Sequence, residues 1–315
     1  MLWFEDGWKR QDLPRPVVAT IGNYDGVHRG QQAILERLVA SARAHGLPAT
    51  VVTFEPHPLS VVAPEQAPER LASRSQKRDL LAASAVDAVV EIRFDPGFAA
   101  TSAENFVRRF LHRVLSVREV VVGSRFVFGR RQAGDLALLQ RIGKELGFAV
   151  HGVDEVELAE SAISSSRIRR AVGSGDVAGA CAMLGHPFAL RGTIIHGERR
   201  GKGLGWPTIN LQPEQEVRPA RGVYLTEVRL GGESLQRRSV TNVGVRPTIS
   251  TASEIVVESH ILDFSRDVYG AQAEVTFIER LRDEQAFENV AALSHQIRQD
   301  VERAREFFAE RSNTG

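Results

Sequence analysis

The chain has 315 residues, enough for two domains of ordinary size, and its 43% hydrophobic and 25% charged residues are typical of a globular protein. A formal net charge of +1 gives no electrostatic reason to expect nucleic acid or an anionic membrane as the main partner. The single cysteine, Cys181, excludes a disulfide framework and a cysteine-based zinc site within one chain. Because neither a signal-peptide pattern nor an apolar run of about 20 residues is present, we expect a cytoplasmic protein without a membrane span, as a monomer or weak homo-oligomer.

From residue 16 to residue 185, short apolar runs alternate with longer segments of helical periodicity. The runs predict strands over 16–21, 49–54, 88–94, 119–123 and 149–153, and the periodic segments predict helices over 31–45, 75–83, 102–114 and 136–146. This alternation predicts an α/β domain, a Rossmann-like doubly wound parallel sheet with helices on both faces. In such a sheet, ligands bind at the carboxyl ends of the strands.

The first predicted strand runs into a glycine-rich turn, Gly22 to Gly30, and then into the first helix. Strand, glycine turn and helix are typical of a site for nucleotide phosphate, because backbone N–H groups and a helix N-terminus point at the anion. His28 adds a titratable donor within the turn. The pattern is not a P-loop, since no Gly-Lys-Ser/Thr ends it.

Two further polar segments belong to this part of the chain. Residues 122–131 follow a predicted strand, and residues 163–169 precede a helix. Serines at a helix start cap backbone N–H groups and can contact phosphate, which makes Ser165 and Ser166 candidates. Arg169 is suited to clamp a phosphate with two hydrogen bonds.

Near residue 186 the pattern changes to short alternating runs separated by glycine and proline. The runs predict strands over 188–195, 222–230, 238–243, 255–262 and 273–278, followed by a helix over 287–310. Several short strands with turn signals indicate a small barrel or sandwich, and we predict a small antiparallel β-barrel with a C-terminal helix. Because Gly185-His186-Pro187 breaks the preceding helix, we place the domains at 1–185 and 186–315.

The second domain begins with another glycine-rich segment, residues 197–210. Its glycines allow the backbone to approach a ligand closely, and its basic residues suit phosphates. Thr208 and Asn210 then offer two neutral oxygen ligands on one side of a strand, which, with substrate phosphates, suit Mg²⁺. Glu258, on another predicted strand, offers a carboxylate that can orient a hydroxyl or take its proton.

These segments together resemble the bifunctional bacterial riboflavin kinase/FMN adenylyltransferase family, also called FAD synthetase. The resemblance covers nearly the whole chain. The segments that carry it are T-I-G-N-Y-D-G-V-H-R-G-Q, T-F-E-P-H-P, V-G-S-R-F-V-F-G and I-S-S-S-R-I-R in the first domain, and P-T-I-N, N-V-G-V-R-P-T and E-S-H-I-L-D in the second. It implies a nucleotidyltransferase of the HxGH class that transfers AMP from ATP to FMN, giving FAD, and a kinase that phosphorylates riboflavin. The implied partners are therefore the small molecules ATP, riboflavin and FMN, with Mg²⁺ as cofactor.

The resemblance also implies roles for single residues. His28 and its turn bind the ATP phosphates, and Ser165 and Arg169 hold the triphosphate. Thr208 and Asn210 hold Mg-ATP, while Glu258 acts as a base on the ribityl 5′-hydroxyl. The predicted set is catalytic His28 and Glu258; nucleotide-binding Gly22, Asn23, Asp25, Gly30, Gln31, Ser165, Ser166, Arg169, Gly197, Lys202 and Gly203; flavin-binding Phe54, Pro56, Arg125, Phe126, Asn242, Arg246 and Arg282; and metal-binding Thr208 and Asn210.

Three residues depart from the family pattern. Gln31 replaces the second histidine of HxGH, Arg125 replaces an acidic or amide residue, and Ser166 replaces a threonine. Glutamine carries no charge, and losing one charged donor in a phosphate-transfer site costs on the order of 2–4 kcal/mol. Arg125 could supply that charge from across the site or fill the nucleotide pocket. Two alternatives therefore stay open: a monofunctional kinase, and a paralogue that uses another flavin or nucleotide.

Overall fold

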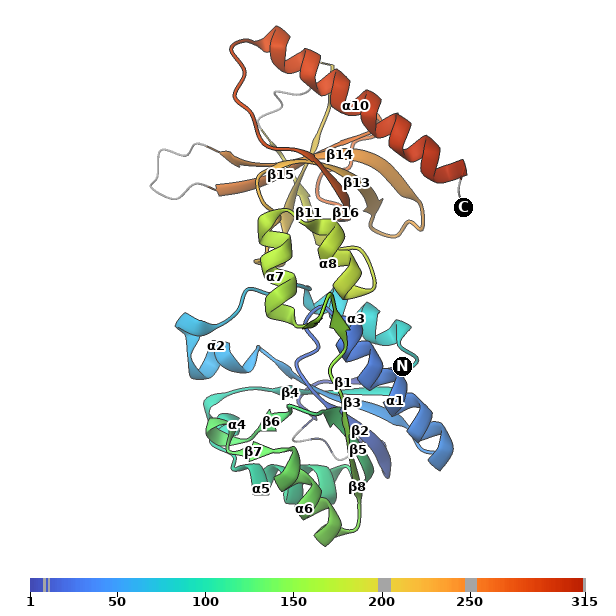
Figure 1. Ribbon diagram of the computed structural model, residues 1–315, viewed down its shortest axis with the longest axis vertical. Coiled ribbons are helices and arrows are strands. Elements are labelled where there is room, and N and C mark those ends of the chain that lie inside the picture. Colours follow the sequence, from blue (N-terminus) through green and yellow to red (C-terminus); the bar gives the residue numbers. More distant parts are fainter. Residues whose placement is uncertain (8–9, 11, 198–204, 247–253, 314–315) are drawn as a thin grey trace. The chain divides into compact units, whose positions relative to one another are not determined.

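The protein forms two compact units, each with its own core (Figure 1). The computed structural model describes residues 1–7, 10, 12–197, 205–246 and 254–313. By its internal contacts the first unit comprises Met1–Glu69 and Arg74–Ser164, and the second comprises Arg70–Ser73 and Ser165–Gly315.

A six-stranded parallel sheet forms the centre of the first unit. Its strand order is β1-β4-β3-β2-β5-β8, so the order reverses at β2, which lies between β3 and β5. Ligands bind doubly wound sheets at the carboxyl ends of strands beside such a switch point. The glycine turn follows β2 at this place. The strands are β1 (Leu2–Phe4), β2 (Val17–Ile21), β3 (Ala49–Glu55), β4 (Ala88–Arg93), β5 (Val117–Gly123) and β8 (Ala149–Val153).

Helices cover both faces of this sheet. On one face, Leu35 and Leu38 of α1 (Arg29–His45) and Leu81 of α3 (Arg74–Ala83) pack with strand residues. On the other, Phe106, Phe110 and Ile142 belong to a second cluster. Burial on both sides explains why the central strands are continuous apolar runs. The second face carries α5 (Ala103–Asn105), the π-helix η3 (Phe106–Val114) and α6 (Leu136–Leu146).

Short elements complete the first unit. The helix predicted over 102–114 is present as α5 followed by η3, and the edge strand β1 was not predicted. The remaining elements are α2 (Pro58–Val62), η2 (Pro64–Gln66), α4 (Pro96–Ala99), β6 (Val127–Phe128), η4 (Arg130–Gln132), β7 (Gly134–Asp135), β9 (Glu157–Leu158) and β10 (Ser161–Ala162).

The second unit is a closed antiparallel barrel, which confirms the predicted barrel, and its strand order is β11-β12-β15-β14-β13-β16. Helix α10 (Val290–Asn313) packs Val301, Ala304 and Phe308 against barrel residues that include Val223 and Leu225. The strands are β11 (Ala189–Ile195), β12 (Ile209–Pro213), β13 (Gly222–Leu230), β14 (Gln236–Arg246), β15 (Glu254–Ile261) and β16 (Gln272–Arg282).

Helices α7 (Ser165–Ser174) and α8 (Val177–Leu184) group with the barrel by their contacts. One such contact is the hydrogen bond from Ala220 N–H to Val172 O, at 3.2 Å. The sequence placed both helices in the first domain, because Gly185 is the clearest helix-breaking signal. The boundary at 185/186 stays a prediction.

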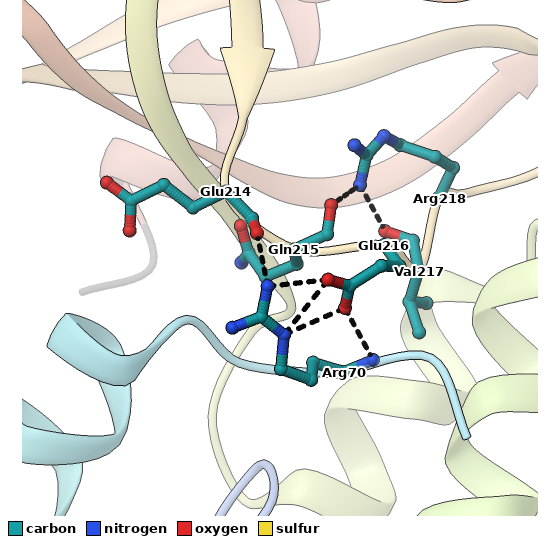
Figure 2. A network of polar contacts seen from close by, with 6 residues as sticks. All are labelled: Arg70, Glu214, Gln215, Glu216, Val217 and Arg218. Carbon is teal, nitrogen blue, oxygen red and sulfur yellow. Dashed lines mark hydrogen bonds and ion pairs between the residues drawn. The ribbon is translucent and has the colours of Figure 1, made fainter. Parts of the chain in front are cut away.

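A short segment from the first half of the chain, Arg70–Ser73, also belongs to the second unit (Figure 2). The Arg70 side chain donates from Nε to Glu216 Oε2 at 2.9 Å and from Nη2 to the Glu214 carbonyl at 3.0 Å. Its backbone N–H also donates to Glu216 Oε2, at 3.0 Å. Burial raises the pKa of Glu216, but the hydrogen bonds from Arg70 outweigh it and hold that pKa below its usual value.

Candidate active sites

The glycine turn after β2 is fixed to its surroundings at both ends. Gly22 N–H donates to Val52 O on β3 at 3.0 Å. The Tyr24 hydroxyl shares a 2.8 Å hydrogen bond with Thr20 Oγ1, and burial raises the pKa of this phenol. Gly26 has φ +86°, a conformation that glycine adopts without a steric cost. The turn is therefore a rigid base for the helix that follows.

His28 is the N-cap of α1, and Gln31 is its partner in a capping box. His28 Nδ1 accepts from Gln31 N–H at 3.3 Å, and Gln31 Oε1 accepts from His28 N–H at 3.1 Å. Since Nδ1 accepts, the ring proton of the neutral imidazole lies on Nε2. Burial lowers the His28 pKa from 6.5 to about 4, against the opposing effect of Asp25. The buried ring is therefore a neutral donor at neutral pH.

The capping box explains how glutamine is accommodated at position 31. Gln and Glu are the residues that complete such a box from the third helical position. Gly30 leaves space for the ring, since a Cβ there would lie 3.3 Å from His28 Nδ1. The sequence interpretation treated Gln31 as the loss of a charged donor, and the structure adds a part in fixing the His28 ring.

Lys77, which the sequence analysis did not single out, lies against the same turn. It is on α3 and only 8% exposed, and its Nζ donates to Asn23 O at 3.2 Å and to Thr53 Oγ1 at 3.4 Å. Thr53 Oγ1 also donates to Asn23 O, at 3.3 Å. Nothing in the local pattern of helix 75–83 distinguishes this lysine from a solvent-exposed one.

His57 connects the T-F-E-P-H-P loop to the turn. The Asn23 side-chain amide lies 3.0 Å from His57 Nε2. The atom of Asn23 in this contact is Nδ2, and on the other side of the ring His57 Nδ1 accepts from Leu59 N–H at 3.2 Å. Asn23 thus contacts β3 through its backbone and the loop after β3 through its side chain.

The loop after β5 leaves Arg125 exposed and paired with an acidic residue. The Arg125 side chain is 79% exposed and its Nη2 lies 2.7 Å from Glu155 Oε2. Phe126 stacks on Phe128 at 5.3 Å, and Phe54 contacts Phe98 at 6.0 Å, both beside the same apolar core. The flavin-binding roles of Phe54, Pro56, Arg125 and Phe126 stay predictions.

The third predicted segment of this site continues directly into α7. The Ile163 carbonyl lies 3.9 Å from the position of a Cβ on Gly30. Ser165, Ser166 and Arg169 follow in α7, which belongs to the second unit. Their contacts with nucleotide stay predictions.

In the barrel, three of the predicted residues lie side by side on neighbouring strands. Asn210 of β12 is directly opposite Glu258 of β15, and Glu258 is directly opposite Asn242 of β14. Opposed residues on antiparallel strands point to the same face with Cβ atoms about 4.5–5.5 Å apart. A carboxylate therefore lies between two amides on one face of the barrel.

Asn210 fits the role of a metal ligand. Its side chain is 6% exposed, and Oδ1 has no hydrogen-bond partner within the described part of the chain. A buried oxygen without a partner is costly unless a ligand supplies one. The backbone of Gly197 lies against the Asn210 amide, because a Cβ on Gly197 would overlap the amide atoms of Asn210. Oxygen ligands of this kind suit Mg²⁺.

His260 supports the segment that carries these ligands. Its Nδ1–H donates to the Pro207 carbonyl at 2.8 Å, and its ring contacts Trp206 edge-on at 5.4 Å. Thr208 follows Pro207 directly. His260 therefore acts on this segment through packing and a backbone hydrogen bond.

The remaining kinase residues are only partly placed. Arg282 pairs with Asp300 of α10 through Nε at 3.0 Å and Nη2 at 2.7 Å, so its guanidinium is engaged by the protein. Arg246 ends β14. Lys202 and Gly203 lie outside the described residues. The roles of Arg246, Arg282 and Gly197 stay predictions.

Comparison with known proteins tests the resemblance. The family model for FAD synthetase matches residues 10–167, and that for riboflavin kinase matches residues 184–308. The bifunctional riboflavin kinase/FMN adenylyltransferase of Escherichia coli (strain K12) is 40% identical over 291 residues, covering 92% of each chain, and that of Pseudomonas fluorescens is 41% identical over 295 residues, covering 94% of each. The chain belongs to this family.

The family membership confirms the bifunctional prediction. The enzyme is a riboflavin kinase and an FMN adenylyltransferase, because both family models match and the relatives align over both parts. A crystal structure named as a macrolide-efflux protein from Streptococcus pneumoniae has the same fold, with a TM-score of 0.86 and 27% identity over 97% of this chain and 99% of its own. Within the described residues, no helix is long and apolar enough to cross a membrane.

Proposed function

We propose that each unit contains one of the two active sites, with riboflavin phosphorylated on the Asn210–Glu258–Asn242 face and FMN adenylylated at the glycine turn. The observation that carries the proposal is the register that sets Glu258 between Asn210 and Asn242. ATP, riboflavin and FMN are then the substrates, which favours the cytoplasm as the place of action.

In the kinase reaction, the 5′-hydroxyl of riboflavin attacks the γ-phosphorus of ATP, the bond to the β,γ-bridging oxygen breaks and ADP leaves, and Glu258 takes the hydroxyl proton. Thr208 and Asn210 hold Mg²⁺, which neutralises charge on the phosphates when bound. The unpartnered Oδ1 of Asn210 supports this assignment. Asn242 lies across from Glu258 and orients the hydroxyl or the carboxylate.

In the adenylyl transfer, a phosphate oxygen of FMN attacks the α-phosphorus of ATP and pyrophosphate leaves. His28 donates Nε2–H to a phosphate oxygen, which stabilises the charge that develops there. The N-terminus of α1 adds N–H groups that have no partner within the helix. The capping box supports this role, because it fixes the imidazole with Nε2 as its donor.

The direct test supplies the full-length protein with riboflavin, ATP and Mg²⁺ and follows the flavins by chromatography. We expect FMN to appear first and FAD to follow, with pyrophosphate formed in proportion to FAD. Chelating Mg²⁺ with EDTA should stop both steps. FMN without FAD, even with FMN supplied, would rule out adenylyl transfer by the glycine turn.

The metal assignment predicts a selective defect in Asn210→Leu. The substitution keeps the size of the side chain and removes the oxygen, so riboflavin phosphorylation should fall roughly 100-fold, with a higher Mg²⁺ requirement. FAD formation from supplied FMN serves as the internal control and should be unchanged. If riboflavin phosphorylation by Asn210→Leu required the same Mg²⁺ concentration as the wild-type enzyme, the assignment would be contradicted.

A further inference from the structure

The peptide group between Asn23 and Tyr24 is held from inside the protein. The Asn23 carbonyl accepts two hydrogen bonds, from Lys77 Nζ at 3.2 Å and from Thr53 Oγ1 at 3.3 Å. In a trans peptide the carbonyl and the following N–H point in opposite directions. The N–H of Tyr24 therefore points away from Lys77.

This peptide orientation is strained at the next residue. Tyr24 has φ +50°, a left-handed conformation that is unfavourable for a residue with a side chain. Rotation of the Asn23–Tyr24 peptide plane by about 180° would move this φ into the broad allowed region at negative values. The ring would stay in place, because it is buried and its hydroxyl is bonded to Thr20. The flip would therefore relieve the strain at Tyr24.

A flip of the Asn23–Tyr24 peptide would exchange the directions of the Tyr24 N–H and the Asn23 carbonyl. An anion site requires N–H groups directed at the ligand, and a carbonyl oxygen directed there repels phosphate. The two hydrogen bonds to the Asn23 carbonyl oppose the flip. Lys77 contributes the charged one, and hydrogen bonds from charged donors are roughly twice as strong as neutral ones.

Lys77 lies among charged groups at this buried position. Burial lowers the pKa of its ammonium and Arg74 adds to that shift, while the carboxylates of Glu55, Glu91 and Asp25 oppose it by favouring the charged form. Lys77 is buried on α3 and reaches both Asn23 in the turn after β2 and Thr53 of β3. It thus joins two strand ends at the edge of the sheet where the turn lies.

We propose that Lys77 is a positioning residue for adenylyl transfer, which holds the Asn23 carbonyl inward so that the turn presents N–H groups to the ATP phosphates. The proposal rests on the proposed function of the glycine turn. Lys77 itself does not touch the substrate.

The test replaces Lys77 by methionine, an unbranched side chain of similar length without charge. We expect kcat/KM for ATP in FAD formation to fall at least 100-fold, while KM for FMN stays within twofold. Riboflavin phosphorylation by the same chain should be unchanged, which shows that the protein is folded. Lys144→Met, an exposed lysine of α6 in the same unit, is the matched control and should behave as wild type.

Two further measurements separate positioning from a purely structural role. Thr53→Val removes the weaker hydrogen bond to the same carbonyl and should lower kcat/KM for ATP in FAD formation 3- to 10-fold. Its effect should not be additive with that of Lys77→Met. In Lys77→Ala, propylammonium should restore FAD formation at least tenfold, whereas 1-propanol of the same size should not.

The outcomes decide the proposal. FAD formation within threefold of wild type in Lys77→Met overturns it, as does an equal loss of both activities or equal rescue by propanol. If the wild-type protein makes no FAD, the proposed function fails, and that result is seen without any Lys77 variant.

Discussion

Replacing Glu258 by glutamine is expected to lower riboflavin phosphorylation by roughly 100- to 10,000-fold, the range over which a general base contributes. Glutamine has the size of glutamate and can still accept a hydrogen bond, but it does not take up the proton of the ribityl hydroxyl. The position between Asn210 and Asn242 should be preserved, since both neighbours are amides that can pair with an amide. The loss should therefore appear in kcat, with little change in KM for ATP.

The measurement is steady-state FMN formation at saturating riboflavin and Mg-ATP, with FAD formation from supplied FMN as the internal reference. Glu279→Gln makes the same change on an exposed residue of β16 and should leave both activities unchanged. A Glu258→Gln enzyme that phosphorylates riboflavin within tenfold of wild type would show that the hydroxyl needs no carboxylate at this position.

The elements of both units were largely predictable because each follows a local signal. Apolar runs with turn residues at their ends located β2 to β5 and β8, and the alternating runs after residue 186 located the barrel strands other than β12. The edge strand β1 has three residues and no pattern of its own, since its pairing with β4 alone defines it. The assignment of α7 and α8 by contacts depends on tertiary packing, which a helix-breaking glycine does not report.

Site residues could be predicted from the sequence only where they belong to a recognisable motif. The register of β12, β15 and β14 brings Asn210, Glu258 and Asn242 together although the segments are far apart in the chain. Lys77 was not predicted because only its burial against the turn distinguishes it. The ion pair of Arg125 with Glu155 was not predicted either, because the two residues lie on different loops. Gln31 reads as a defect in a pattern, yet in the helix start it completes a capping box.

The second large effect is expected at His28. Asparagine is a good N-cap residue, so His28→Asn should keep α1 intact while removing the imidazole donor. FAD formation should fall roughly 100- to 1,000-fold, the cost of losing one preorganised donor at a developing charge. Riboflavin phosphorylation should be unchanged, and His112→Asn, in η3 of the same unit, is the matched control. Activity within tenfold of wild type would remove His28 from the transfer step.

The titration of His28 gives an independent check of the same assignment. In the folded protein burial lowers its pKa to about 4, whereas the unfolded chain takes up the proton near 6.5. Stability should therefore fall as the pH drops from 6.5 towards 4, by up to about 3 kcal/mol, and His28→Asn should lack this slope. Histidine NMR resonances should show His28 neutral at pH 6 without nucleotide. Because phosphate charge favours the protonated ring, Mg-ATP should move its titration upward, and no movement on saturation would contradict direct contact.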